Sequence, residues 1–207
     1  MSNSLNCFKQ YSELAMASYA NFDAKDIEDT IDLPASKSFF KKYKVLYQDS
    51  KVFSGFSATL FEKIESEEYR EELKDVADKI ISFRGTDDIV NDSMNANYGW
   101  ILNKLPVMVY NDITKFIQYC INDNYLGYND NIAVTGHSLG GALSQLFYAT
   151  FYKDFQNIKG VYTFNSPGIV GIVNSFKEFI KLDLSLSCNE NKKNMKTMKI
   201  IKLLRKV

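Results

Sequence analysis

The fold of this chain is decided by the stretch Gly136-His137-Ser138-Leu139-Gly140-Gly141. The apolar run 132–134 comes directly before it and is typical of a short buried strand. The residues that follow, from 142 to 148, have the composition and spacing of an amphipathic helix. We therefore expect a strand, a tight turn and a helix, with Ser138 at the tip of the turn.

The two glycines that flank the serine at a distance of two residues have a steric explanation. A strand-to-helix turn this sharp strains the backbone of Ser138, and side chains at positions 136 and 140 would collide. Such a turn raises the serine hydroxyl above the sheet and places the first N–H groups of the helix where an oxyanion would form. The pattern Gly-x-Ser-x-Gly between a strand and a helix indicates a nucleophile elbow, whereas a chance match in a glycine-rich turn would lack these flanking elements.

The composition fits one sizeable domain. The 207 residues are 45% hydrophobic and 14% aromatic, which is enough to build a core. The net charge of zero hides an asymmetry, because residues 188–207 contain seven basic residues and one acid and so carry +6. The rest of the chain therefore carries −6, and this acidic body argues against nucleic acid as the main partner.

Localisation is predicted from what the sequence lacks. No apolar run is long enough to cross a membrane, and residues 1–10 lack the features of a secretory signal. The three cysteines, Cys7, Cys120 and Cys188, are widely spaced, and we interpret them as free thiols in a reducing compartment. We expect a cytoplasmic protein. Export by a route that needs no cleaved signal stays open as an alternative.

Strands alternate with helices along the chain, which indicates a parallel sheet covered on both faces. We expect helices over 4–20, from Pro34 to about 43, over 106–122, from the elbow to about 152, and over 170–181. We expect strands over 52–61, 79–83 and 159–165, the last two buried. The charged segment 65–78 is interpreted as a solvated excursion with some helix.

Residues 89–105 have no clean period and admit two interpretations. They form either an irregular surface loop or a mobile lid whose apolar face covers a substrate cleft. We favour the lid, because Trp100, the single tryptophan of the chain, lies here among other apolar residues.

Three blocks occur in order and at a matching spacing: 80–86, which ends in Phe-Arg-Gly-Thr, then 134–143, which contains Gly-His-Ser-Leu-Gly-Gly, and then 161–168, which ends in Asn-Ser-Pro-Gly. Together they resemble the fungal-type (class 3) lipase family of α/β-hydrolases over roughly residues 5–180. The resemblance implies an α/β-hydrolase-like fold for residues 1–183, with a mostly parallel sheet that is incomplete at its C-terminal end. A basic, Lys/Asn-rich tail, 184–207, follows this partial domain.

The resemblance also implies roles for three residues. Ser138 would be the catalytic nucleophile, and Leu139 would offer its backbone N–H to the oxyanion. Thr86 would give the second donor of this oxyanion hole, through its N–H and its hydroxyl. The segment after Thr86 matches the lid of the family in position. Such enzymes hydrolyse ester bonds of acylglycerols or phospholipids at interfaces and need no metal or cofactor.

The base of a catalytic triad has no candidate in this sequence. The order in this fold is serine, acid and histidine, yet the one histidine, His137, precedes the serine. Adjacent residues of the elbow point in different directions, so we interpret His137 as a packing and hydrogen-bonding residue of the turn. Without a base, Asp183 has nothing to orient and is not assigned as the acid. In subtilisin the loss of the triad histidine costs about 10⁶-fold in kcat, and roughly 10³–10⁴ over water remains.

The tail and the activity each have alternatives. The tail has the pattern of a basic amphipathic helix that would dock on an anionic membrane or on the acidic body. Alternatively, it is the non-native ending of a truncated hydrolase, and we favour this truncation. The first functional hypothesis is a lipase- or esterase-like serine hydrolase that is incomplete as it stands, so that its activity would need a base from a second polypeptide or from a continuation of the chain. The second is a non-catalytic lipid- or membrane-binding remnant, and the third is a peptidase or thioesterase on the same fold.

Overall fold

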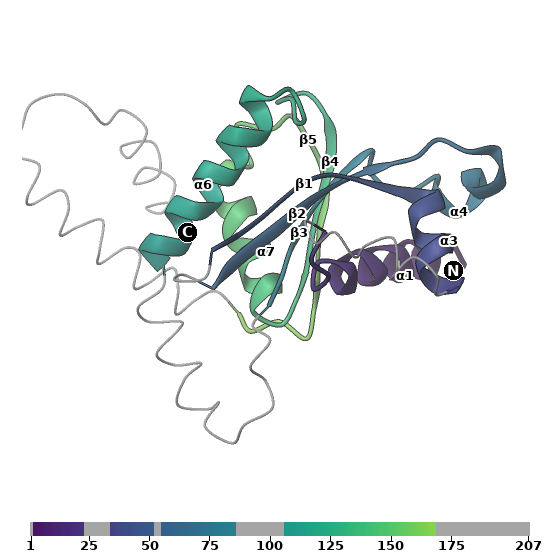
Figure 1. The fold of residues 1–207 in the computed structure, drawn as a ribbon, viewed down its shortest axis with the longest axis horizontal. Helices are drawn as coiled ribbons and strands as arrows, with labels where there is room; N and C mark the ends of the chain where they lie inside the picture. Colours follow the sequence, from purple (N-terminus) through teal and green to yellow (C-terminus); the bar gives the residue numbers. More distant parts are fainter. Residues whose placement is uncertain (1, 23–33, 52–54, 86–105, 169–207) are drawn as a thin grey trace, which may run out of the picture.

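The computed structural model describes residues 2–22, 34–51, 55–85 and 106–168, and the account below concerns these residues. They contain a five-stranded sheet in which the strands lie side by side in the order of the sequence. The strands are β1 (Tyr43–Lys51), β2 (Phe56–Lys63), β3 (Lys79–Phe83), β4 (Asn131–His137) and β5 (Asn157–Phe164). Figure 1 shows the twisted sheet between two layers of helices.

The sheet is mixed. β1 pairs with β2 and β2 with β3 in antiparallel register, whereas β3, β4 and β5 are parallel to one another. A short connection joins β1 to β2, and residues 64–78, which contain a 3-10 turn and a short helix, join β2 to β3. Connections that contain a longer helix join the parallel strands, as parallel pairing requires. The predicted α/β architecture is therefore confirmed, and its parallel part is β3–β5.

Helices cover both faces of the sheet, as predicted (Figure 1). α1 (Ser2–Ala17) packs on one face, where α3 (Pro34–Lys42), the single 3-10 turn η1 (Glu67–Tyr69) and the short α4 (Arg70–Leu73) also lie. α6 (Pro106–Asn122) and α7 (Leu139–Phe151) pack on the other face. Among the described residues, no helix combines the length and the hydropathy that crossing a bilayer would need.

Alternate residues of the central strands fill two separate cores. On the α6 and α7 face, Ile81 and Val134 join the larger apolar cluster. On the α1 face, their neighbours Ile80 and Ala133 pack with Tyr11 and Leu14 of α1 in a smaller one. This division follows from the two-residue period of a strand, which sends successive side chains to opposite faces.

Several predicted boundaries are confirmed and others are shifted. The strand at 79–83 and the helix at 106–122 have the predicted ends, and the helix that opens at Pro34 is present. The N-terminal helix ends at Ala17, and the strand predicted over 52–61 begins at Phe56, directly after Gly55. The charged segment 65–78 contains η1 and α4, in agreement with its interpretation as an excursion with some helix.

β5 was predicted as a buried strand, and this prediction is wrong. Its side chains are half-buried or exposed, and none is fully buried. The reason is its place at the edge of the described sheet, where it pairs with β4 alone among the described strands. An apolar strand composition therefore does not distinguish a central strand from this one.

The start of α7 lies directly on the carboxyl end of β3. A Cβ atom placed on Gly140 would overlap the carbonyl oxygen of Phe83, and one placed on Gly136 would overlap the carbonyl group of Gly140. In each case the obstacle is backbone, which cannot move aside as a flexible side chain can. The steric reason predicted for the two glycines is confirmed.

The buried ammonium group of Lys42 holds α1 through Gln10 and Glu13. Lys42, 4% exposed at the end of α3, donates to Oε1 of Gln10 (3.1 Å), Oε2 of Glu13 (2.9 Å) and Oε1 of Glu72 (3.2 Å). Burial alone would lower the pKa of the Lys42 ammonium, but the hydrogen bonds and charges of Glu13 and Glu72 outweigh it and raise that pKa above its ordinary value. The cation therefore ties α1, α3 and α4 together.

Gly140→Ala should disrupt the fold around the elbow. Because the added methyl group would overlap the Phe83 carbonyl, we expect the free energy of unfolding to fall by about 3 kcal/mol or more. Urea unfolding measures the change. The matched control is Gly168→Ala, since a Cβ there meets no atom within 4 Å, and its effect should stay within about 0.5 kcal/mol. Equal effects of the two substitutions would contradict the close backbone contact.

Lys42→Met should destabilise the chain by about 2 kcal/mol, because it leaves Glu13 and Glu72 without their shared cation. The control is Lys41→Met at the neighbouring position, where the side chain is 61% exposed and pairs at 3.8 Å with Glu68, and we expect about 0.5 kcal/mol or less.

The contribution of Lys42 should also depend on pH. Because the folded-state pKa is raised, this contribution is fully present below the unfolded pKa of lysine and is lost as the pH rises through the folded value. Thermal unfolding of the parent and of Lys42→Met should therefore differ at pH 8 and converge in strong alkali. A constant difference would show that the charge is not responsible.

Candidate active site

Ser138 lies where the three parallel strands end. It follows β4 directly, is 6% exposed and has φ 56° and ψ −126°. A positive φ is strained for a residue with a side chain and persists only when the surroundings enforce it. One such contact comes from β5, because the Ser138 N–H donates to the carbonyl oxygen of Phe164 (2.9 Å). The predicted elbow geometry is present.

The N-terminus of α7 adjoins the serine. Leu139 is the first helical residue, where a backbone N–H has no acceptor within the helix, and the N–H of Gly141 donates back to the carbonyl oxygen of Ser138 (3.0 Å). The first turn of α7 contains no acidic residue, so no carboxylate within the helix offsets its positive end. The surroundings of Leu139 thus suit the binding of a developing oxyanion.

The segment after β5 rests on the first turns of α7. Gln145 of α7 donates through Nε2 to Oγ of Ser166 (3.1 Å) and, at 3.4 Å, to the carbonyl oxygen of Pro167. A Cβ on Gly141 would come within 2.6 Å of the Ser166 side chain, so this contact is close. No sequence motif marks Gln145, although the four-residue step from Gly141 places both on one side of the helix.

His137 is turned toward the N-terminal part of the chain. Its Nδ1 lies 3.1 Å from the hydroxyl of Tyr19, at hydrogen-bonding distance, and the two rings are tilted with centroids 6.1 Å apart. The prediction that His137 is a hydrogen-bonding residue of the turn is confirmed. Tyr19 itself was missed, because in the sequence it is one more apolar position at the end of a helix.

Gly85 brings the end of β3 against the elbow. A Cβ on Gly85 would lie 2.8 Å from the carbonyl oxygen of His137 and 3.3 Å from Cβ of Ser138. Thr86, the second predicted oxyanion donor, follows Gly85 but lies outside the described residues. The predicted lid over 89–105, the position of Asp183 and the tail 184–207 lie outside them too, as does Cys188. Cys7 and Cys120 are free thiols, as predicted.

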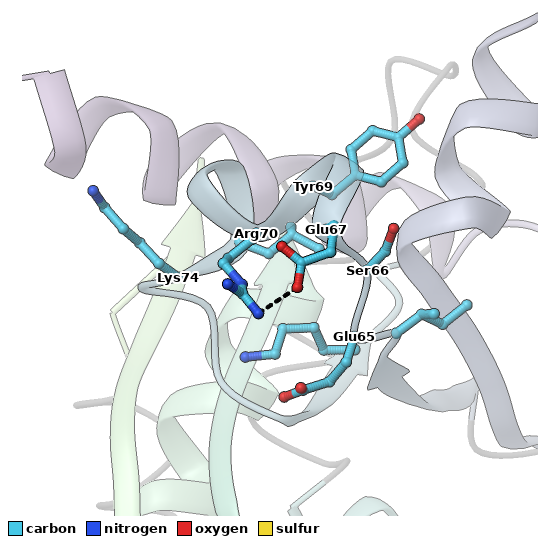
Figure 2. A pocket seen from close by; sticks show the side chains of 9 residues that line it. Glu65, Ser66, Glu67, Tyr69, Arg70 and Lys74 are labelled. Atoms are coloured by element: carbon cyan, nitrogen blue, oxygen red, sulfur yellow. Dashed lines mark ion pairs between the residues drawn. The ribbon is translucent and has the colours of Figure 1, made fainter.

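A surface hollow of about 310 Å³ lies at the other end of the sheet, lined by residues between Lys63 and Lys74. β3 begins at this end and reaches Phe83, next to the elbow, at the opposite one. The cations of the hollow are paired with acids: Figure 2 shows Arg70 beside Glu67, 2.5 Å apart, and the other two pairs are Lys74–Glu71 and Lys63–Asp78. In the described part of the chain, no group of three or more His, Cys, Asp or Glu side chains is arranged to hold a metal.

A solved lipase structure shares this fold. The lipase from Rhizopus microsporus var. chinensis matches with a TM-score of 0.50 and 18% identity, over 77% of this chain and 56% of that one. A Rhizomucor miehei lipase, solved as a propeptide complex of a deletion mutant, matches with a TM-score of 0.43 and 19% identity, over 84% and 56%. The chain therefore spans a little over half the length of these lipases.

The sequence itself was compared with curated proteins and with models of protein families. No curated protein matches it. The family model described as Lipase (class 3) matches residues 35–190, which is well over half of the chain and includes both the elbow and the end of β3. The chain belongs to the class 3 lipase family.

Proposed function

We propose that this chain is a serine hydrolase domain that acts on carboxylic ester bonds of acylglycerols or phospholipids, with Ser138 as its nucleophile. The observation that carries the proposal is the backbone of Ser138, which is strained at φ 56° and ψ −126° between β4 and α7. Strained residues of this kind cluster at active sites, where the surrounding structure enforces them. Membership of the class 3 lipase family supports a lipid or ester substrate.

The proposed chemistry is acyl transfer in two steps. Oγ of Ser138 attacks the ester carbonyl carbon and gives up its proton to water or to a base supplied in solution, while the carbonyl oxygen becomes an oxyanion. The N–H of Leu139 and the donor groups of Thr86 stabilise this oxyanion, assisted by the positive end of α7. Collapse of the intermediate breaks the bond to the alkoxide, which takes up a proton from water and leaves as the alcohol. Water then hydrolyses acyl-Ser138 to the free acid and restores the serine hydroxyl.

We further propose that the base is not His137. Its Nδ1 is engaged with the hydroxyl of Tyr19, on the side of the α1 helix. No other histidine occurs in the 207 residues, so they contain no imidazole to accept the serine proton. Acylation of Ser138 should then depend on strain and oxyanion stabilisation alone, which leave roughly 10³–10⁴-fold over water when a triad is incomplete.

The test is covalent modification of Ser138 by an alkyl fluorophosphonate, followed by intact mass and peptide mapping. We expect slow, stoichiometric labelling at Ser138 and p-nitrophenyl butyrate turnover close to the uncatalysed rate. Added imidazole should accelerate turnover of the parent chain, because it supplies the missing base.

Ser138→Ala is the control for both measurements, since imidazole alone also cleaves activated esters. The buried Ser144, in α7 and bonded to the carbonyl oxygen of Gly140 (2.9 Å), gives a matched variant, Ser144→Ala, that should label like the parent. Failure of Ser138 to label in the parent would refute the proposal. If a parent chain that fails to label bound liposomes through residues 189–207, the two results together would favour the lipid-binding remnant.

A further inference from the structure

The hydroxyl of Tyr19 lies between the ends of two strands of the site. It is 3.1 Å from Nδ1 of His137, which precedes Ser138 at the end of β4. A Cβ on Gly85, just beyond β3, would lie 2.5 Å from the same hydroxyl oxygen. The phenol therefore fills the space beside Gly85 so closely that not even a methyl group would fit.

The backbone that carries Tyr19 is fixed by a buried side chain of β1. The amide of Gln48 donates to the carbonyl oxygen of Ala20 (2.9 Å) and accepts from the N–H of Phe22 (2.8 Å). The same amide nitrogen also donates to Oγ1 of Thr59 in β2 (2.9 Å). Gln48 is 8% exposed, so these bonds have little competition from water.

α1, which leads into Tyr19, is fixed by the strands of the site themselves. Oγ of Ser82 in β3 donates to the carbonyl oxygen of Leu14 (3.0 Å), and Oγ1 of Thr135 in β4 donates to that of Tyr11 (3.1 Å). Both hydroxyl-bearing residues are fully buried. β3 and β4, which end next to Gly85 and Ser138, thus hold the helix that leads to Tyr19, and the Tyr19 phenol lies at those same strand ends.

We propose that Tyr19 is a positioning residue of the Ser138 site, which locks the His137 ring and the end of β3 in the arrangement that presents the serine and its oxyanion donors. The inference rests on the proposed function of Ser138. Tyr19 precedes residues 35–190, the part that matches the class 3 lipase model, so the site extends into a segment outside that match.

This role predicts which step depends on the phenol. In the proposed role the hydroxyl acts through its contacts with His137 and with the space beside Gly85. Its removal should loosen the backbone on either side of the serine and slow the covalent step, while reversible binding of an acyl chain is left unchanged. Small displacements of a nucleophile or of its oxyanion donors are costly in rate.

The experiment measures the covalent labelling of the full chain by an alkyl fluorophosphonate over a range of concentrations, which separates the maximal rate from the apparent dissociation constant. For Tyr19→Phe we expect a maximal rate about 10-fold lower, because the serine and its oxyanion donors are held less firmly, and a dissociation constant within about twofold. Tyr128→Phe, at a tyrosine that is 50% exposed and precedes β4, whereas the elbow follows the other end of that strand, is the matched control and should label like the parent.

The single histidine provides a second, independent readout. With ¹⁵N-labelled histidine, NMR should show one tautomer of His137 in the parent and in Tyr128→Phe, because the phenol fixes the role of Nδ1. In Tyr19→Phe the two ring nitrogen signals should move toward the average of the tautomers. A tyrosine that only fills space would leave both the tautomer and the labelling rate unchanged when its ring is kept.

The outcomes separate the two proposals. No labelling of Ser138 in the parent would refute the proposed function and this inference with it. Labelling of the parent, with unchanged rate and unchanged imidazole signals in Tyr19→Phe, would overturn the role of Tyr19 alone. If Tyr19→Phe proved unstable, Gln48→Ala, which releases the segment that carries Tyr19, should reproduce the mixed tautomers, and a single tautomer there would count against the inference.

Discussion

The structure depends on a contact between two pieces of bare backbone, the carbonyl of Phe83 and the Cα of Gly140. Only glycine lets α7 cross the end of β3 so closely, and this crossing is one of the contacts that enforce the sharp turn at Ser138. Within this turn the N–H of Ser138 donates a hydrogen bond to the carbonyl oxygen of Phe164. β3, β5 and α7 therefore all contact the strained turn at Ser138. The glycines that allow these contacts lie within the part of the chain that matches the class 3 lipase model.

The two faces of the sheet contribute differently to this arrangement. The face under α6 and α7 is a continuous apolar cluster, which supplies the burial that stabilises the domain. The face under α1 combines apolar residues with buried hydroxyls, an amide and the Lys42 ammonium, each of them paired. Directional bonds of this kind fix the position of a helix more narrowly than apolar contact does. The helix held in this way is the one that leads to Tyr19.

Local patterns sufficed to predict the elements and the elbow. The ends of β3 and α6 follow from an apolar run and from a proline at a first helical position, and the glycines at 136 and 140 follow from the sterics of one turn. Tyr19, Gln48 and Gln145 could not be found in this way. Tyr19 meets His137 across 118 positions of the sequence, and that meeting depends on strand register and helix docking, which no local pattern encodes. The exposure of β5 escaped for the same reason, since an edge strand and a central strand share their composition.

The bond from Ser138 to Phe164 has a consequence for synthesis of the chain on the ribosome. The residue that accepts it lies 26 positions after the serine, and the strand that contains it pairs with β4 in parallel. Until β5 has left the exit tunnel, the carbonyl oxygen of Phe164 cannot accept the bond from Ser138 that helps to keep the turn strained. The nascent elbow should therefore stay unstrained while α1, β1, β2 and β3 are already assembled, and acquire its final form only as β5 docks. Reactivity of the serine would then be among the last properties the growing domain gains.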